Sequence, residues 1–268
     1  MRTLNFENTT ILITGASSGI GKEFAIQLAR EGANLILTAR THSDLKKLAD
    51  ELESRHTNIW VIAIPADLSE SNGARTLFEK TSDLGFSVDY LINNAGFGRF
   101  CQFPEKDFET YHRMIMLNIN SLVELTHLYL PFMRKNNIGG IINVASTASF
   151  QPLPYQAVYG ASKAFVLSFS EALTGELLDT DLRVMALCPG ATESRFMDTA
   201  NADTSNMKLA RPSEVVSSEL KAFSQGRMLK ISGTANYLTS LIPRMVSRKT
   251  VVKIVSNMFK ESISSKPE

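Results

Sequence analysis

Cysteine is scarce in this sequence: Cys101 and Cys188 are the only two among 268 residues. Two thiols cannot make the four-ligand set of a structural zinc site, and these two form no C-x-x-C pair. The four histidines show no metal-ligand spacing either. We therefore expect no metal site, and we interpret both cysteines as reduced thiols of a cytoplasmic protein.

An excess of one charge is missing as well. The 28 basic and 27 acidic residues leave a formal net charge of +1. Because a general affinity for nucleic acid needs surplus basic charge on one face, we expect no nucleic-acid partner. With 44% hydrophobic and 21% charged residues, the composition also excludes an intrinsically disordered chain.

Long hydrophobic runs are absent too. No uninterrupted apolar run approaches the ~18 residues of a membrane-spanning helix, and the first eight residues lack the apolar centre of a secretion signal. A chain of this length can bury most of its surface without a disulfide or a metal. The sequence therefore predicts a globular protein that stays on one side of a bilayer, with peripheral membrane contact left open.

What the sequence does contain is an alternation of apolar strand-like runs and helical patterns. Such runs, separated by helices, indicate a seven-stranded parallel sheet covered on both faces, and right-handed crossovers then give a doubly wound α/β (Rossmann) fold. We predict one domain over 1–232, with a long loop over 191–211, and a helical extension over 233–268 that is not an independent domain. The expected strands are Thr10–Thr14, Leu35–Thr38, Trp60–Ile64, Val88–Ile92, Gly140–Val144, Leu182–Leu187 and a weak one at Met228–Ile231.

A glycine-rich turn follows the first expected strand and opens a helical pattern. Glycines let the backbone turn tightly and approach a pyrophosphate, whose charge meets the N–H groups at the start of the helix. The spacing G-x-x-x-G-x-G differs from the general G-x-G-x-x-G fingerprint, so the dinucleotide hypothesis depends on the strand–turn–helix context. The turn is Thr14-Gly15-Ala16-Ser17-Ser18-Gly19-Ile20-Gly21.

The same turn also satisfies G-x-S-x-G, the nucleophile elbow of hydrolases. That elbow belongs on a central strand, whereas Gly15 follows the first strand. The catalytic histidine should also come late in the chain, but the last histidine is His127. These two departures exclude the hydrolase alternative.

The end of the second expected strand carries Ala39 followed by Arg40. An NAD site usually has a carboxylate there for the ribose 2′-OH, whereas an arginine accepts the 2′-phosphate of NADP. A solvated surface arginine is the alternative interpretation. Because the carboxylate is missing, the sequence favours NADP(H).

Several polar residues fall where strands end. Tyr159 and Lys163 are four residues apart in a helical pattern, so their side chains share one face. Ser146 follows the fifth expected strand, while Asn93–Gly96 and Pro189–Gly190 follow the fourth and sixth. Each alone is a weak signal, since Ser146 could be a simple loop or cap residue. Together they lie at the carboxyl edge of the sheet, where open α/β folds bind ligands.

With Asn118, these motifs resemble the short-chain dehydrogenase/reductase family in order and spacing, over about residues 8–232. The resemblance implies an NADP(H)-dependent carbonyl reductase or alcohol dehydrogenase that forms a homodimer or homotetramer. It also implies that Asn118, Ser146, Tyr159 and Lys163 are catalytic. Besides Tyr159 and Lys163, the cofactor contacts it implies are Gly15, Ser17, Ser18, Gly19, Ile20, Gly21, Arg40, Asp67, Leu68, Asn94, Ala95, Gly96, Pro189, Gly190, Thr192 and Ser194.

Within this resemblance, Asp67 and Leu68 hold the adenine, and Thr192 and Ser194 bind the nicotinamide amide. The family usually has threonine where Ser194 stands, and because the hydroxyl is kept we expect little change. Asn118 anchors a water on the proton path. The alternative for Asn118 alone is a helix-internal polar residue bonded to backbone.

The chemistry of the pair supports this assignment. A free phenol has a pKa near 10 and is a poor proton donor or acceptor at neutral pH. We expect the Lys163 ammonium and the oxidised nicotinamide ring to lower the pKa of Tyr159 by about three pH units. Tyr159 would then protonate a carbonyl oxygen as hydride arrives, and Ser146 would donate a hydrogen bond to that oxygen.

Apolar side chains in the expected rim loops indicate an apolar carbonyl substrate (lipid-, steroid- or xenobiotic-like) rather than a sugar. The alternative is that they only pack the loops together. A second class of function is a non-catalytic NADP-binding redox sensor on the same fold, which would not need the proton donor. The rim residues are Phe97, Phe100, Phe150, Leu153, Phe196, Met197 and Met207.

The C-terminal extension has a pattern of its own. Apolar residues from Met245 to Phe259 recur at helical spacing over Arg244–Lys260, among five basic residues and no acidic one before Glu261. One interpretation is an amphipathic helix packed on its own subunit or on a partner subunit. The other is an interfacial helix drawn to anionic lipid.

Overall fold

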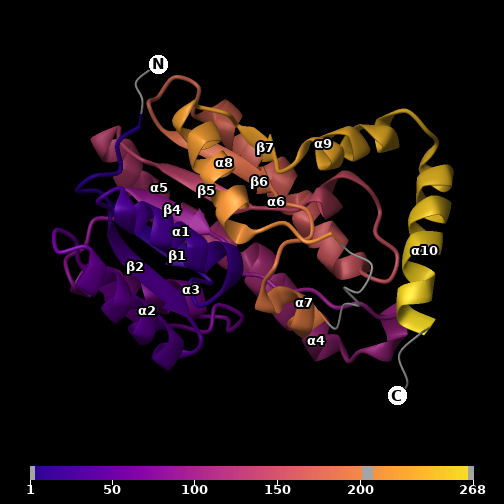
Figure 1. Ribbon diagram of the computed structural model, residues 1–268, viewed down its shortest axis with the longest axis horizontal. Coiled ribbons are helices and arrows are strands. Elements are labelled where there is room, and N and C mark those ends of the chain that lie inside the picture. The colour runs from indigo at the N-terminus through magenta and orange to yellow at the C-terminus, as the bar shows by residue number, and fades with distance from the viewer. Residues whose placement is uncertain (1–3, 201–207, 265–268) are drawn as a thin grey trace.

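A computed structural model describes residues 4–200 and 208–264 of the chain. Its centre is one seven-stranded sheet in the order β3-β2-β1-β4-β5-β6-β7, with all neighbours parallel (Figure 1). This confirms the predicted doubly wound α/β fold. The strands are β1 Thr10–Thr14, β2 Asn34–Ala39, β3 Val61–Pro65, β4 Tyr90–Asn93, β5 Gly140–Val144, β6 Arg183–Cys188 and β7 Leu229–Ile231.

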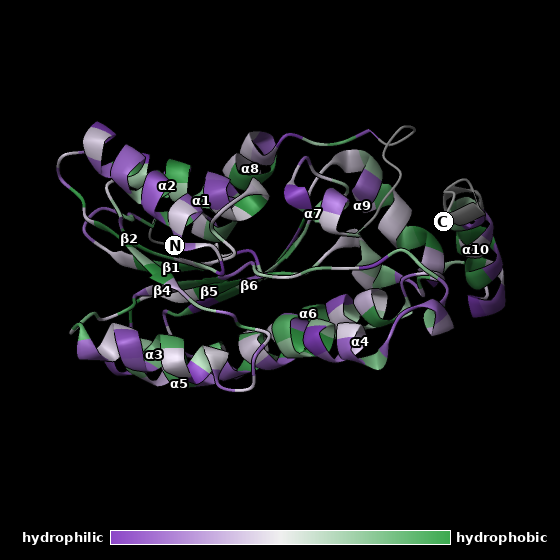
Figure 2. Ribbon diagram, turned by 90° about the horizontal axis from the view of Figure 1, so that it is seen from below, coloured by the Kyte–Doolittle hydropathy of each residue, from purple (hydrophilic) through white to green (hydrophobic). Residues whose placement is uncertain are grey.

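Helices cover the sheet on both faces because its strands are apolar on both sides. Figure 2 shows α1, α2 and α8 above the sheet and α3, α5 and α6 below it, in agreement with the two largest apolar clusters. The chain order changes direction between β1 and β4, and ligands of such sheets bind at the carboxyl ends beside that point. The helices are α1 Gly19–Arg30, α2 His42–Arg55, α3 Gly73–Asp83, α4 Phe108–Ile115, α5 Ser121–Asn136, α6 Ala157–Glu176, α7 Arg195–Ala200, α8 Pro212–Ser224, α9 Thr234–Leu241 and α10 Arg248–Ser264.

The segment after β6 differs from the prediction of a long loop over 191–211. It contains the short helix α7, and Thr192 forms a parallel bridge with Ala210. The part 201–207 lies outside the described residues. Local periodicity could not indicate α7, because six residues span fewer than two helical turns.

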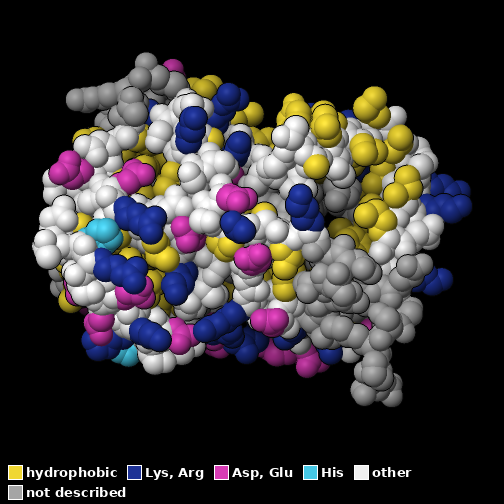
Figure 3. All heavy atoms as spheres, in the orientation of Figure 1, with side chains coloured by type: hydrophobic (Ala, Val, Ile, Leu, Met, Phe, Trp, Pro, Cys, Tyr) yellow, Lys and Arg dark blue, Asp and Glu magenta, His cyan; other side chains and the backbone are white. Residues whose placement is uncertain are grey.

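Two helices follow the last strand, in the region of the predicted extension. A 3-10 turn at Ile242–Arg244 separates α9 from α10, so the second helix begins at Arg248 rather than at Arg244. In Figure 1, α10 forms the outer edge of the molecule, beyond the carboxyl ends of the strands. Hydrophobic side chains gather on the surface over α9 and α10 (Figure 3). Among the described residues, no helix is long and apolar enough to cross a membrane.

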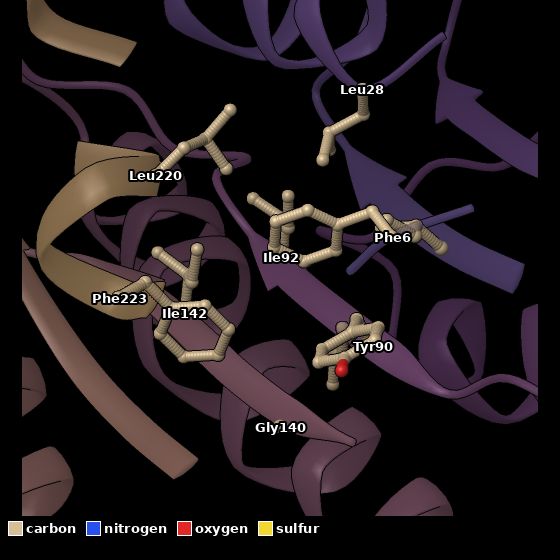
Figure 4. Close-up of a pocket in the computed structure, with 10 residues that line it drawn as sticks. Phe6, Leu28, Tyr90, Ile92, Gly140, Ile142, Leu220 and Phe223 are labelled. Atoms are coloured by element: carbon tan, nitrogen blue, oxygen red, sulfur yellow. The ribbon is translucent and has the colours of Figure 1, made fainter. Parts of the chain in front are cut away.

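The core beneath α1 and α8 is tightly packed. Phe6, Tyr90 and Phe223 meet edge to face, and aliphatic side chains from β4 and β5 fill the space between them (Figure 4). The small void at their centre has no room for a water-sized molecule. This apolar interior supports the sheet and offers no ligand site.

Glu219 of α8 is unusual because its carboxyl group is buried, with 0% of the residue exposed. Its Oε1 accepts a hydrogen bond of 3.0 Å from the Ser232 hydroxyl, while Oε2 has no partner. Burial raises the pKa of this carboxyl from 4.5 to about 8, although the Ser232 bond and the Lys230 charge act in the opposite direction. The folded protein therefore keeps a proton that the unfolded chain releases at lower pH.

We predict that this proton makes stability fall as pH rises. Between about pH 5 and about pH 8, the Glu219 carboxyl binds fewer protons in the unfolded chain than in the folded one. The free energy of unfolding therefore falls by up to ~1.4 kcal/mol for each pH unit. Glu219→Gln removes that contribution, so its free energy of unfolding in urea should fall less over this range than that of the wild type. The control is Glu214→Gln, an exposed position on the same helix. Equal pH dependence in all three proteins would contradict the prediction.

Candidate active site

The glycine turn joins β1 to α1 with two residues in the left-handed region. Gly15 has φ +66° and Gly19 has φ +54°, conformations that side chains rarely adopt. A Cβ atom on Gly21 would overlap the Gly15 carbonyl oxygen and the Asn94 amide. Only glycine at these positions lets α1 start this close to the end of β1.

The turn is tied to the neighbouring strand β4. The Asn94 side-chain amide donates to the carbonyl oxygens of Thr14 (2.8 Å) and Gly15 (3.2 Å). In return, the Thr14 hydroxyl accepts hydrogen bonds of 2.9 Å from the backbone N–H groups of Asn94 and Ala95. The two strand ends at the switch point therefore form one rigid unit. Asn94 and Ala95 were predicted as site residues, whereas the role of Thr14 was not.

The start of α1 suits the pyrophosphate of a dinucleotide. Its first turn carries no acidic residue, and the Ser18 side chain makes no capping hydrogen bond. The positive end of the helix dipole is therefore not neutralised by this chain, which favours a bound anion. Ser17, Ser18 and Ile20 are partly exposed along this turn.

At the ends of β2 and β3, Arg40 is exposed and Asp67 is partly buried. The Asp67 carboxylate accepts bonds from Ser69 Oγ (2.6 Å), from the Ser69 backbone N–H (2.9 Å) and from Arg113 Nη2 (2.9 Å). Partial burial raises the pKa of Asp67, but the Ser69 bonds and the charges of Arg113 and Arg40 lower it overall. Leu68 is buried in the core cluster of the α3 side.

Arg113 was not predicted. It lies on α4, far in sequence from the Asp67 it pairs with, and a lone arginine in an amphipathic helix gives no local signal. The pair fixes the carboxylate beside the exposed Arg40.

Helix α6 carries Tyr159 and Lys163 on one face. The buried Lys163 Nζ donates to the carbonyl oxygen of Val144, the last residue of β5, at 2.7 Å, and it lies 5.9 Å from the centre of the Tyr159 ring. Ser146, two residues beyond β5, lies near the Tyr159 hydroxyl and acts to lower the pKa of that phenol. The Ser146 hydroxyl also accepts a bond of 3.1 Å from Ala148 N–H. Three of the predicted catalytic side chains therefore meet.

Burial dominates the protonation of this cluster. It raises the pKa of Tyr159 to about 12, although the Ser146 hydrogen bond acts to lower it, and it lowers the pKa of Lys163 to about 8. The lowered phenol pKa was predicted for Lys163 acting together with the oxidised nicotinamide ring, and for that complex it stays a prediction. Desolvation penalises the charged forms of both groups, the phenolate and the ammonium. Tyr159 therefore carries its phenolic proton at neutral pH and can donate it.

Asn118 lies in a π-helical turn, Met116–Asn120, between α4 and α5. Its side-chain amide donates to the Phe97 carbonyl and to Ser162 Oγ, both at 3.0 Å, and its Oδ1 accepts from Phe97 N–H at 3.1 Å. A Cβ atom on Gly96 would lie 3.1 Å from Asn118 Oδ1 and 3.4 Å from Lys163 Nζ. The side chain thus holds the segment after β4 against α6. Its predicted role in anchoring a water stays a prediction.

The segment after β6 lies over the glycine turn. Thr192 Oγ1 donates to the Gly190 carbonyl at 3.0 Å, and Thr147 N–H donates to the Pro189 carbonyl at 3.0 Å. A Cβ atom on Gly19 would overlap the Ser194 side chain. Regions far apart in the sequence therefore converge, as the sequence analysis predicted for one rim.

An aromatic wall borders Tyr159. The Phe196 ring lies 5.4 Å from it between centroids, and a Cβ atom on Gly98 would touch both rings. Phe100, from the same segment as Gly98, contacts Phe259 of α10 at 5.6 Å. Met207, the last predicted rim residue, lies outside the described residues.

Comparison with known proteins decides the family, since residues 9–205 match the model of the short chain dehydrogenase family. The chain belongs to the short-chain dehydrogenase family. As a member, this short-chain dehydrogenase is an oxidoreductase that binds a nicotinamide cofactor, and similar solved structures include complexes with NADPH and with NAD.

Three similar proteins illustrate the range of the family. A short-chain dehydrogenase from Sphingobium yanoikuyae, solved with NADPH, is 30% identical, with a TM-score of 0.79 over 97% of this chain and 98% of that one. A bulky-bulky ketone specific alcohol dehydrogenase from Comamonas testosteroni is 28% identical, with a TM-score of 0.75 over 100% and 98%. A very-long-chain 3-oxoacyl-CoA reductase from Coccidioides immitis is 34% identical over 78% of this chain and 60% of its own length.

The close contact between α1 and the glycine turn generates a paired prediction for this short-chain dehydrogenase. Gly21→Ala should lower stability by ~1–3 kcal/mol, because its methyl group meets backbone, and should weaken NADPH binding ~10-fold or more. Gly175→Ala, in α6 with open space around it, should instead stabilise by ~0.5–1 kcal/mol and leave NADPH affinity unchanged. Thermal unfolding and NADPH fluorescence titration measure both effects. Equal behaviour of the two variants would refute the packing argument.

Proposed function

We propose that this protein is an NADP(H)-dependent carbonyl reductase or secondary-alcohol dehydrogenase with an apolar substrate. The observation that carries the proposal is the meeting of Ser146, Tyr159 and Lys163 at the carboxyl edge of the sheet. A protein that only sensed the cofactor would have no use for a phenol poised to give up a proton.

NADPH, when bound, supplies hydride to the carbonyl carbon of the substrate. Tyr159 gives its phenolic proton to the carbonyl oxygen, so that the carbonyl becomes an alcohol and Tyr159 is left as a phenolate. Ser146 donates a hydrogen bond to the same oxygen and stabilises the charge that develops there. With a pKa of about 8, Lys163 is mostly an ammonium at neutral pH, and its charge stabilises the phenolate until solvent returns the proton.

The cofactor preference rests on the end of β2. Arg40 follows Ala39, where an NAD site would hold a carboxylate, and it is exposed for pairing with a 2′-phosphate. In the proposal, Asp67 and Leu68 bind the adenine, and the hydroxyls of Thr192 and Ser194 bind the nicotinamide amide. The Arg113 contact to Asp67 keeps that carboxylate oriented and reduces its repulsion of the phosphate.

The substrate preference rests on the rings beside Tyr159. Phe196 flanks the phenol directly, and Phe100 lies in the adjoining segment. Such a wall favours an apolar ketone over a sugar, whose hydroxyls would lose hydrogen bonds to water there. The bulky ketone and very-long-chain acyl specificities stated for two similar proteins support the same class.

The proposal includes a homodimer or homotetramer in the cytoplasm. Phe132 of α5 and Phe165 of α6 are exposed on the lower helix layer, and apolar side chains of this size are typical of subunit contacts. Reduced Cys101 and Cys188, both free and buried, suit a reducing compartment. Light scattering of the purified protein measures the oligomeric mass.

Tyr159→Phe should keep NADPH affinity within ~3-fold and lower kcat by ~100-fold or more, because the ring remains while the proton donor is lost. Fluorescence titration and NADPH absorbance measure the two quantities. Tyr237→Phe, on an exposed ring of α9, is the control and should retain both. A Tyr159→Phe enzyme with most of its turnover would rule out the proposed mechanism.

Wild-type enzyme should prefer NADPH to NADH at least ~10-fold, since an arginine–phosphate pair contributes more than ~1.4 kcal/mol. Arg40→Asp should erase or reverse that ratio. Arg30→Asp makes the same charge change at the far end of α1 and should leave the ratio as it is. A wild type that prefers NADH would show that the interpretation of Arg40 is wrong.

A further inference from the structure

The surface of α9, the 3-10 turn and α10 exposes large apolar side chains. Met245 is 82% exposed, Met258 66%, Leu238 59% and Ile242 49%. Figure 3 shows hydrophobic side chains gathered on the surface over α9 and α10. We call this surface the tail face; its apolar members are Tyr237, Leu238, Ile242, Met245, Val246, Val252, Ile254 and Met258.

The packing of α10 bears on the two interpretations of the extension. Val251 is buried, and Phe259 contacts Phe100, so the helix is held to the body of the protein by one side. Ile254 and Met258, one turn apart and on the same face of the helix as Val251, remain exposed. The amphipathic stripe is therefore only partly used within the subunit.

Up to Lys260, every charged residue of the tail face is basic. The sequence contains no acidic residue between Glu219 and Glu261, whereas it contains eight basic ones. Arg244 and Arg248 lie at the turn, and Lys249 and Lys253 share one side of α10, all exposed. Three of the eight, Lys221, Arg227 and Lys230, precede α9, and the five that belong to the turn and α10 are Arg244, Arg248, Lys249, Lys253 and Lys260.

We propose that the tail face docks the protein onto the surface of an anionic lipid bilayer. Exposed methionine, leucine and isoleucine side chains beside lysine and arginine match both parts of such a surface, the acyl boundary and the negative headgroups. A second copy of this chain fits less well, because a symmetric contact of this face with itself would set like charges against each other. The contact is peripheral, since no described helix could cross the bilayer.

Docking in this way would bring the bilayer close to the candidate active site. Phe259 of α10 contacts Phe100, and Gly98 of the same segment packs on Tyr159. An apolar substrate dissolved in the bilayer would then meet the site at its aromatic wall. Docking itself does not depend on the proposed reaction and is tested without it.

Co-sedimentation of the full-length protein with vesicles tests the proposal. Binding to phosphatidylcholine vesicles that contain phosphatidylglycerol should exceed binding to pure phosphatidylcholine at least ~10-fold, and added salt should weaken it. The triple variant Arg248→Glu/Lys249→Glu/Lys253→Glu should lose ~100-fold or more in partitioning. The control Lys80→Glu/Lys135→Glu/Lys221→Glu makes the same charge change at exposed lysines of α3, α5 and α8 and should lose far less.

A second pair of variants tests the apolar part. Met245→Ser/Met258→Ser should weaken partitioning by ~10-fold or more, whereas Phe108→Ser/Leu178→Ser, at equally exposed positions elsewhere, should not. Circular dichroism and NADPH affinity confirm that each variant is folded. Wild-type protein that ignores anionic vesicles would overturn the proposal. Tail-face variants that keep full vesicle binding would also overturn it. If the wild type shows no lipid preference and the variants change the oligomeric mass, the tail face is a subunit contact instead.

Discussion

The candidate site depends on a buried lysine amine. Lys163 Nζ lies inside the protein and donates to the last carbonyl group of β5, a bond that ties α6 to the carboxyl edge of the sheet. Taking an ammonium out of water is costly, and the lowered pKa of Lys163 expresses that cost. Because Tyr159 lies one helical turn earlier, the same bond fixes the phenol against Ser146. The burial of Lys163 therefore determines both where Tyr159 lies and how readily Lys163 is protonated.

A buried polar network supports this edge from behind. Asn93 of β4 donates to Asn143 of β5 at 2.9 Å, and Asn143 donates to Ser170 of α6 at 3.0 Å. In an apolar interior such bonds are specific, because a shift of strand register or helix rotation would leave buried amides unpaired. The network thus aligns β4, β5 and α6. Asn94 follows β4, Ser146 follows β5, and Tyr159 lies on α6. The geometry of the candidate site at the rim is set by hydrogen bonds one layer below it.

Much of the fold could be predicted from local pattern. Apolar runs indicated all seven strands. The glycine turn and the Tyr159–Lys163 spacing could also be predicted, because each depends only on residues close together in the sequence. What could not be predicted depends on distant residues: Arg113 pairing with Asp67, Asn118 holding Phe97, and α7 lying over the glycine turn. The raised pKa of Tyr159 in the protein without cofactor could not be predicted either, because a charge at four-residue spacing is visible in a sequence, whereas desolvation is not. The exposure of Met245 and Met258 could not be predicted either, because helical spacing indicates an apolar helix face but not whether other residues cover that face.

Turnover itself tests the central claim, that Tyr159 and the buried Lys163 form a reductase site. The measurement is NADPH consumption by the wild-type enzyme, followed by absorbance, with a panel that pairs bulky apolar ketones with ketose sugars. The account predicts steady consumption with at least one apolar ketone and little with the sugars. A protein that binds NADPH tightly yet consumes none with any carbonyl compound would contradict it, and would show that the site holds the cofactor without using it.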